Sequence, residues 1–192
     1  RFCTQTKPAL GQGWDLLKTL SDEIDRVYDQ GFLQPLGIEW SRLLDEGFLG
    51  KWSLKEMPAQ QNFYAKNIRP PLAESERKRA FVIISDAFRY EAARELTESL
   101  NGRYRMNAKL SAMLGVLPSY TALGMASLLP HETLGYNDKG DVLVDGNSTV
   151  GTEARNKQLA TVEGMACQAK DLLVMKLEEA RTFTQDKRVV YI

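Results

Sequence analysis

The stretch AFVIISDAFRYEAARELTESL, residues 80–100, joins an apolar run to a charged amphipathic segment through one aspartate, Asp86. The run AFVIIS is continuous and rich in β-branched residues, as expected for a strand that is covered on both faces. Helical spacing then places four apolar residues on one face: Tyr90, Ala93, Leu96 and Leu100. The stretch therefore predicts a strand of a parallel sheet that leads through Asp86 into a helix.

The chain beyond residue 100 continues to alternate strand and helix patterns. We predict a second strand in 103–114, a short apolar helix in 117–130 and a hairpin or loop around the strand VLV at 142–144. A final strand is predicted in RVVYI at 188–192. Between them we predict a long helix that buries Met165, Ala169, Leu172, Leu173, Met175 and Leu177. This order is typical of an α/β layered fold with a mainly parallel sheet. We expect 81–85 and 189–191 to be parallel strands of that sheet.

The first 78 residues have a different character. Leucine, isoleucine, valine and tyrosine side chains recur at helical spacing between Trp14 and Gly31, and Pro70-Pro71 followed by AESERKR reads as a boundary. We therefore predict a helical N-terminal region at 1–78 and a partial α/β domain at 79–192. Because a strand rarely ends a compact domain, the closing RVVYI indicates a fragment of a longer protein.

Composition excludes some classes of protein. The chain has 192 residues, 43% of them hydrophobic, and its 25 basic residues balance its 25 acidic ones. A net charge of zero argues against a protein that binds nucleic acid over its whole surface, although a local basic patch is still possible. No apolar run reaches the length of a membrane span, and the polar start is unlike a signal peptide. Cys3 and Cys167 fit no metal or disulfide framework, so we predict a reducing, cytoplasmic location.

Three residues, at two places in the sequence, have side chains suited to a functional site. Asp86 follows the first predicted strand, and Ser119 and Thr121 lead into the helix of 117–130. In open α/β sheets ligands bind at the carboxyl ends of strands, so these side chains are candidates for holding a metal-bound phosphate. Taken singly, each has a plainer explanation: Asp86 caps a helix that begins near Phe88, and Ser119 is an ordinary N-cap.

The two motifs together resemble a known family. VIISDAFRYEAARELTESL and LPSYTALGMASLLPH are similar to the PglZ proteins of bacterial BREX phage-defence systems, which belong to the alkaline phosphatase superfamily. The later VDGNSTVGTEARNKQLA and KRVVYI, and the earlier LSDEIDRVYDQGFLQPLGIEW, extend the resemblance over nearly the whole chain. It implies an alkaline-phosphatase-like α/β fold.

The resemblance also implies roles for single residues. Asp86 matches the first metal ligand of the superfamily, and Thr121 matches the nucleophilic hydroxyl that also contacts the metal. Ser119 is the second candidate for the nucleophile and a candidate for substrate binding, as is Arg89. The implied cofactor is a divalent cation, zinc or else manganese or magnesium, because a threonine hydroxyl needs a cation to lower its pKa. His131 is interpreted as a surface or loop histidine outside this site.

Two functions follow from this resemblance. The first is a metal-dependent phosphatase or phosphodiesterase in BREX defence. It would have other BREX proteins as partners and a phosphoester as substrate. It would contact nucleic acid through the complex that these proteins form. The second is a non-catalytic scaffold that assembles the defence complex. A domain phosphorylated on Asp86 is a weaker third, since no acidic pair lies near the strand. With one histidine in the chain, we expect this stretch alone to carry half an active site and to be inactive.

Overall fold

A computed structural model describes residues 16–192, and the chain divides into two compact units, 1–52 and 53–192. The first unit is helical throughout its described part, as predicted; Trp14 lies outside the described residues. Its helical segments are α2 (Leu16–Tyr28), η1 (Asp29–Leu33), α3 (Gln34–Leu43), η2 (Leu44–Phe48) and α4 (Leu49–Lys51). Pro35 lies at the start of α3, directly after η1, a π-helical segment in which the ordinary α-helical bonding is already interrupted.

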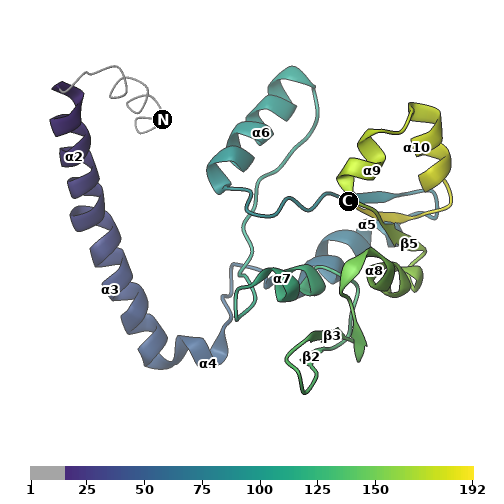
Figure 1. Cartoon of the computed structure of the whole chain (residues 1–192), viewed down its shortest axis with the longest axis horizontal. Helices are drawn as coiled ribbons and strands as arrows, with labels where there is room; N and C mark the ends of the chain where they lie inside the picture. The colour runs from purple at the N-terminus through teal and green to yellow at the C-terminus, as the bar shows by residue number, and fades with distance from the viewer. Residues whose placement is uncertain (1–15) are drawn as a thin grey trace. The chain divides into compact units, whose positions relative to one another are not determined.

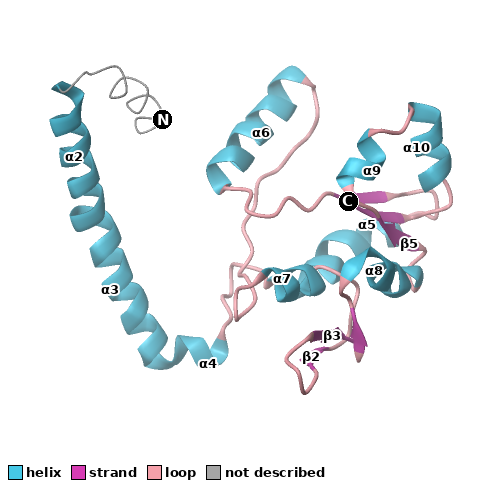
Figure 2. Ribbon diagram, viewed as in Figure 1, coloured by secondary structure: helices cyan, strands magenta, loops and turns pink. Residues whose placement is uncertain are grey.

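The second unit contains a parallel sheet of three strands (Figure 2). Its strands are β1 (Ala80–Val82), β5 (Gly164–Ala166) and β6 (Val189–Tyr191). They lie in the order β1-β6-β5, so that Val190 pairs with Phe81 on one side and with Met165 on the other. All three residues of β6 are buried, which explains its apolar sequence. The predicted parallel pairing of the first and last strands is confirmed.

Helices surround this sheet. The helical elements of the second unit are η3 (Gln60–Asn62), η4 (Tyr64–Ile68), α5 (Arg69–Ala73), α6 (Tyr90–Arg103), α7 (Thr121–Ser127), α8 (Gly151–Ala160), α9 (Ala169–Leu173) and α10 (Leu177–Thr184). In Figure 1, α9 and α10 are drawn above the sheet, and α5 and α8 below it. None of the helices within residues 16–192 has both the length and the apolar character that crossing a bilayer requires.

Two clusters of buried side chains hold the second unit together. The larger contains residues of η4, α5, the parallel sheet, α8 and the loop after α7: Tyr64, Ile68, Leu72, Val82, Leu129, Leu159, Ala166, Val189 and Tyr191. The smaller joins α7 to an antiparallel sheet through Leu123, Ala126, Val142 and Val144. That second sheet consists of β2 (Leu134–Tyr136), β3 (Val142–Val144) and β4 (Asn147–Ser148), in agreement with the hairpin predicted around VLV. The segment 64–72 is helical, as predicted for the N-terminal region 1–78, but its buried side chains belong to the core of the second unit.

Two predictions about elements were wrong. Segment 103–114 forms no strand; instead the Asn101 side chain binds the backbone N and O of Ala108, at 2.7 and 2.9 Å, and only Leu114 makes a bridge, to Ala59. The long helix expected across 165–177 is also absent, because Met165 lies in β5 and α9 ends at Leu173. The helix expected after Asp86 is present as α6, but its apolar face is not buried, with Tyr90 65% exposed.

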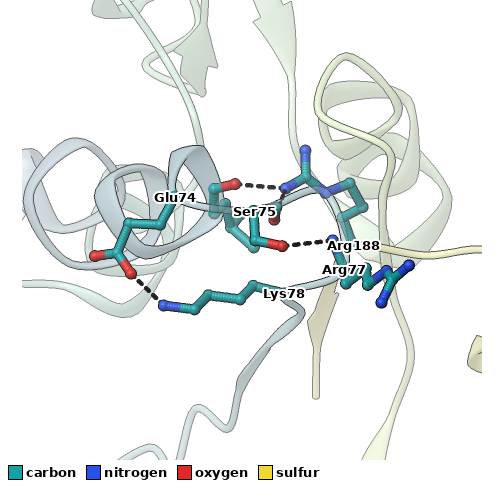
Figure 3. A network of polar contacts seen from close by, with 6 residues as sticks. Glu74, Ser75, Arg77, Lys78 and Arg188 are labelled. Carbon is teal, nitrogen blue, oxygen red and sulfur yellow. Dashed lines mark hydrogen bonds and ion pairs between the residues drawn. The ribbon is translucent and has the colours of Figure 1, made fainter.

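Two arginines form hydrogen bonds with backbone carbonyls at the amino edge of the parallel sheet. The Arg79 Nε donates to the carbonyl of Lys187 at 2.8 Å, and an Arg79 Nη donates to Thr184. The Arg188 guanidinium donates to the carbonyls of Leu72 and Ser75 at 2.6 and 3.0 Å, as Figure 3 shows for Ser75. These bonds satisfy carbonyl groups at the ends of α5 and α10, and they join the helices to the strand edge.

Candidate functional site at the carboxyl edge of the parallel sheet

The carboxyl ends of the three parallel strands lie at one edge. Hydrogen bonds continue the pairing past the strand ends: the Ile84 N–H donates to Ile192 O, the Ile192 N–H to Val82 O, and the Cys167 N–H to Tyr191 O, each at 2.9 Å. The apolar run 80–85 therefore stays beside β6 for longer than the three residues of β1. This is the edge at which open α/β sheets bind ligands.

A cavity of about 310 Å³ lies at this edge. Its walls come from the strand ends and from helices α7, α8 and α9. The lining residues are Ile84, Met125, Leu129, Thr152, Arg155, Ala166, Cys167, Gln168, Ala169, Tyr191 and Ile192. Most of these side chains are apolar, and Arg155 is the one charged side chain among them.

Asp86 lies two residues beyond Ile84, on an exposed turn. Its Oδ1 accepts the N–H of Ala87 at 3.0 Å, and Ala87 has a φ of 56°. The helix begins only at Tyr90, with Arg89 in the N-cap position and no side-chain cap. Asp86 therefore does not cap α6; it is a turn residue whose carboxylate accepts a backbone N–H of the turn. Arg89 is likewise exposed.

Thr121 is the first residue of α7, the helix whose Met125 lines the cavity. Tyr120 before it is extended and accepts the Gly124 N–H at 3.0 Å, so its backbone carbonyl starts the helix while no side chain caps it. Ser119 precedes Tyr120, and both hydroxyl-bearing residues, Ser119 and Thr121, are exposed. Ser119 is thus not the N-cap residue, contrary to the plainer explanation.

The structure brings the segments of the predicted site to one edge, but it shows no bond between their side chains. Within residues 16–192, no hydrogen bond or ion pair joins Asp86 to Thr121, Ser119 or Arg89. Nor do three His, Cys, Asp or Glu side chains of the described part lie together as metal ligands. Asp86 and Thr121 offer two oxygen donors, fewer than a complete zinc site uses. These residues alone do not fit a full metal centre.

Cys167 and Tyr191, which line the cavity, are held in their neutral forms. Burial, followed by the nearby Asp171 carboxylate, raises the pKa of the Cys167 thiol above its ordinary value. Burial also raises the pKa of the Tyr191 phenol, with a smaller effect of Tyr64, and the phenol donates to Leu128 O at 2.7 Å. The raised pKa keeps Cys167 as the neutral thiol at neutral pH.

His131 lies elsewhere, in the loop after α7, as interpreted from the sequence. It is partly buried, and its Nδ1 donates to Leu129 O at 2.7 Å. It lines a second cavity, of about 580 Å³, together with Arg69 and Asp145. A third cavity, of about 640 Å³, lies at the amino edge beside Arg79 and Arg188.

Comparison with known proteins decides the family. The model of the family described as "BREX system PglZ alkaline phosphatase-like domain" matches residues 63–192. The chain belongs to the PglZ family. It is 44% identical over 184 residues to the alkaline phosphatase-like protein BrxZ of Escherichia coli O9:H4 (strain HS), an alignment that covers 94% of this chain and 21% of that protein.

A second PglZ-family relative gives the same coverage. The chain is 36% identical over 180 residues to the alkaline phosphatase-like protein PglZ of Bacillus cereus (strain H3081.97), covering 93% of this chain and 21% of the relative. The chain thus spans about a fifth of the length of these relatives. No solved structure matches it. The matched range begins at residue 63, close to Tyr64, the first residue of the sequence in the larger buried cluster.

One residue of this edge was missed by sequence reasoning. Arg155 lies within TEARNKQLA, a segment with ordinary helical composition and no motif of its own. Its place beside the cavity depends on the packing of α8 against β5, and the sequence analysis did not foresee β5. A spacing rule could not have found it, because the residues around it come from four separate segments.

Proposed function

We propose that the full-length protein hydrolyses phosphoesters as a component of a bacterial BREX phage-defence system. Membership of the alkaline phosphatase-like PglZ family supports the reaction class. The observation that carries the proposal is the convergence of two segments at one edge. Asp86 follows Ile84, Thr121 begins the helix of Met125, and both Ile84 and Met125 line the carboxyl-edge cavity. Ligands of open α/β sheets bind at this edge.

In this proposal the Thr121 hydroxyl is the nucleophile. Its oxygen attacks phosphorus and displaces the alcohol, which carries away the hydroxyl proton, and water then cleaves the phosphothreonine ester and restores the hydroxyl. Ser119 and Arg89 bind the phosphoryl oxygens that do not react, through a hydroxyl donor and a guanidinium group. Ser119 is the alternative nucleophile, since it too is exposed beside α7.

The proposed cofactor is a divalent cation, zinc or else manganese or magnesium, with Asp86 and Thr121 as two of its oxygen ligands. Catalytic zinc sites take three protein ligands, so we propose that other parts of the full-length protein supply the rest. The proposed partners are other BREX proteins, with nucleic acid reached through the assembled complex, and the proposed location is the cytoplasm.

A second candidate function is a scaffold within the same defence complex. The observation that favours it is the exposed apolar face of α6, where Tyr90 is 65% and Leu96 is 48% exposed. Exposed aromatic and aliphatic side chains on one helix suit an interface with another protein. In this function Asp86 and Thr121 would be dispensable for defence.

The test of catalysis uses the full-length protein, a generic aryl phosphate diester and added zinc or manganese. We expect Thr121→Ala and Asp86→Asn each to lower turnover by at least about 100-fold, since each removes a group that acts on the reacting phosphate. Ser119→Ala should lower it less. Asp138→Asn, an exposed aspartate in the hairpin loop, is the matched control and should retain full activity.

Two results would overturn the assignment. Turnover that survives both Thr121→Ala and Asp86→Asn would place the reacting groups elsewhere. Absence of turnover in the wild-type protein, together with phage resistance that both variants preserve, would establish the scaffold. A thermal melt of each variant separates loss of the reaction from loss of the fold.

A further inference from the structure

We propose that the carboxyl-edge cavity is a binding site for a small organic anion, whose apolar body fills the cavity and whose charged head group is held by Arg155. This goes beyond the proposed hydrolysis, because neither Asp86 nor Thr121 lines the cavity. The ligand class is a phosphorylated or carboxylated molecule with a small apolar portion.

The first argument is that Arg155 has no anionic partner in the described part of the chain. Arginines on the helices α2, α3, α6 and α10 pair with carboxylates three or four residues away, for example Arg94 with Glu98 at 3.2 Å. On α8 the positions three and four residues from Arg155 are Thr152, Gln158, Gly151 and Leu159, which carry no charge. Glu153 pairs with Lys157 instead, at 3.6 Å. Among residues 16–192 the partly buried guanidinium of Arg155 thus forms no ion pair, and an anionic ligand would supply one.

The second argument is that α8 is fixed in place beside the cavity. The side chain of Asn156 donates to Ala166 O at 3.1 Å and accepts the Ala166 N–H at 2.7 Å, so one residue of β5 is bonded through both its backbone groups. Three residues further on, Leu159 is fully buried in the larger core cluster. The backbone that bears Arg155 is therefore held on both sides, which lowers the entropy lost when a ligand binds.

The third argument concerns the walls of the cavity. Ile84, Met125 and Leu129 supply apolar surface, and the volume of about 310 Å³ lies at the small end of the range for ligand sites. The Cys167 thiol is neutral because burial raises its pKa, so it does not repel an anion. Thr152 and Gln168 add neutral hydrogen-bonding groups at the wall. An apolar enclosure with one cation and a few neutral polar groups suits an amphipathic anion.

The experiment measures equilibrium binding of phenyl phosphate and of benzoate to the full-length protein by ligand-observed NMR. We expect at least one to bind, and the tighter of the two identifies the head group. Arg155→Gln should weaken that binding about tenfold or more, because it removes a charge-assisted contact and keeps the side-chain length. Ala169→Leu, which narrows the cavity from its exposed rim, should also weaken it.

Lys157→Gln is the matched control: it removes the same charge from the same helix, but its side chain does not line the cavity. We expect its binding to stay within about twofold of wild type, and neutral benzyl alcohol to bind more weakly than the anions. Equal losses in Arg155→Gln and Lys157→Gln would overturn the proposal, as would no binding of either anion at millimolar concentration. Asp86→Asn and Thr121→Ala should still bind the anion, so failure of the proposed hydrolysis leaves this result intact.

Discussion

At the scale of single residues, Asp145 shows how one carboxylate organises a loop. It has a φ of 49° at the turn after β3, and its Oδ1 accepts the N–H groups of Glu132 and Thr133 at 2.9 and 2.8 Å. Its Oδ2 accepts from Gln158 Nε2 at 3.0 Å. Desolvation alone would raise the pKa of Asp145, but the hydrogen bonds from Thr133, Glu132 and Gln158 outweigh it and lower the pKa.

The prediction concerns Asp145→Asn and pH. Asparagine tolerates the positive φ and retains one acceptor oxygen. Its amide NH2 group, however, would face the Gln158 Nε2 donor, so the hydrogen bond between these two side chains would be lost. We expect the free energy of unfolding to fall by about 1 kcal/mol at neutral pH, a low value because the carboxylate is exposed to solvent. Urea unfolding followed by far-ultraviolet circular dichroism measures this difference.

The sign of the pH dependence follows from the lowered pKa. A carboxyl with a lower pKa in the folded state stabilises the fold above its unfolded pKa of about 4, and this contribution is lost as pH falls through the folded value. The gap between wild type and Asp145→Asn should therefore close below about pH 4. A gap that instead widens on acidification would show that the ionised carboxylate does not contribute through these bonds.

At the scale of elements, the junction between α8 and β5 depends on Asn156. Asn156→Ala would leave the N–H and C=O of Ala166 without side-chain partners next to the core. We expect a loss of about 2–3 kcal/mol in the free energy of unfolding, since an unpaired buried polar group costs about 1–3 kcal/mol. Hydrogen exchange at the Ala166 amide should speed up in the variant.

The control for this variant is Asn107→Ala, which removes an exposed loop side chain and should change stability by less than about 0.5 kcal/mol. If Asn156→Ala proves equally mild, water replaces the side chain at Ala166, and the junction is held by apolar packing alone.

The elements that were foreseen are those whose own sequence contains the signal. The run 80–85 and the strand 189–191 are apolar and β-branched, so their buried parallel pairing could be predicted. β5 has the sequence GMA, and only its place beside β6 makes it a strand, so no local pattern indicates it. Segment 103–114 had a suitable composition but has no neighbouring strand to pair with along its length. Asp86 and Thr121 were located by motif, and their convergence on a phosphate stays a prediction.

At the scale of the whole molecule, charge contributes little to stability. Seven ion pairs between described residues join neighbours on one helix or turn, and their side chains are at least half exposed, as in Lys157 with Glu153 at 79% and 90%. Such pairs contribute about 0.3–0.5 kcal/mol each. Stability therefore rests on the two buried clusters rather than on surface charge.

The prediction is a weak response to salt. Raising sodium chloride to about 1 M shortens the screening length to about 3 Å and should lower the free energy of unfolding by no more than about 2 kcal/mol. Leu159→Ala, by contrast, empties a fully buried position and should cost about 2–5 kcal/mol at any salt concentration. A salt-induced loss larger than that of Leu159→Ala would mean that charge interactions dominate.

The order of the strands has a consequence for synthesis on the ribosome. β6, the central strand, is the last of the three to be translated, and Arg79 is separated by 108 residues from its partner Lys187 at the edge of the sheet. At about 5–20 residues per second, β1 waits roughly 5 to 20 s for the strand that it pairs with. During that interval the apolar run from Ala80 to Ile84 has an unpaired edge, which exposes it to aggregation until β6 has been made.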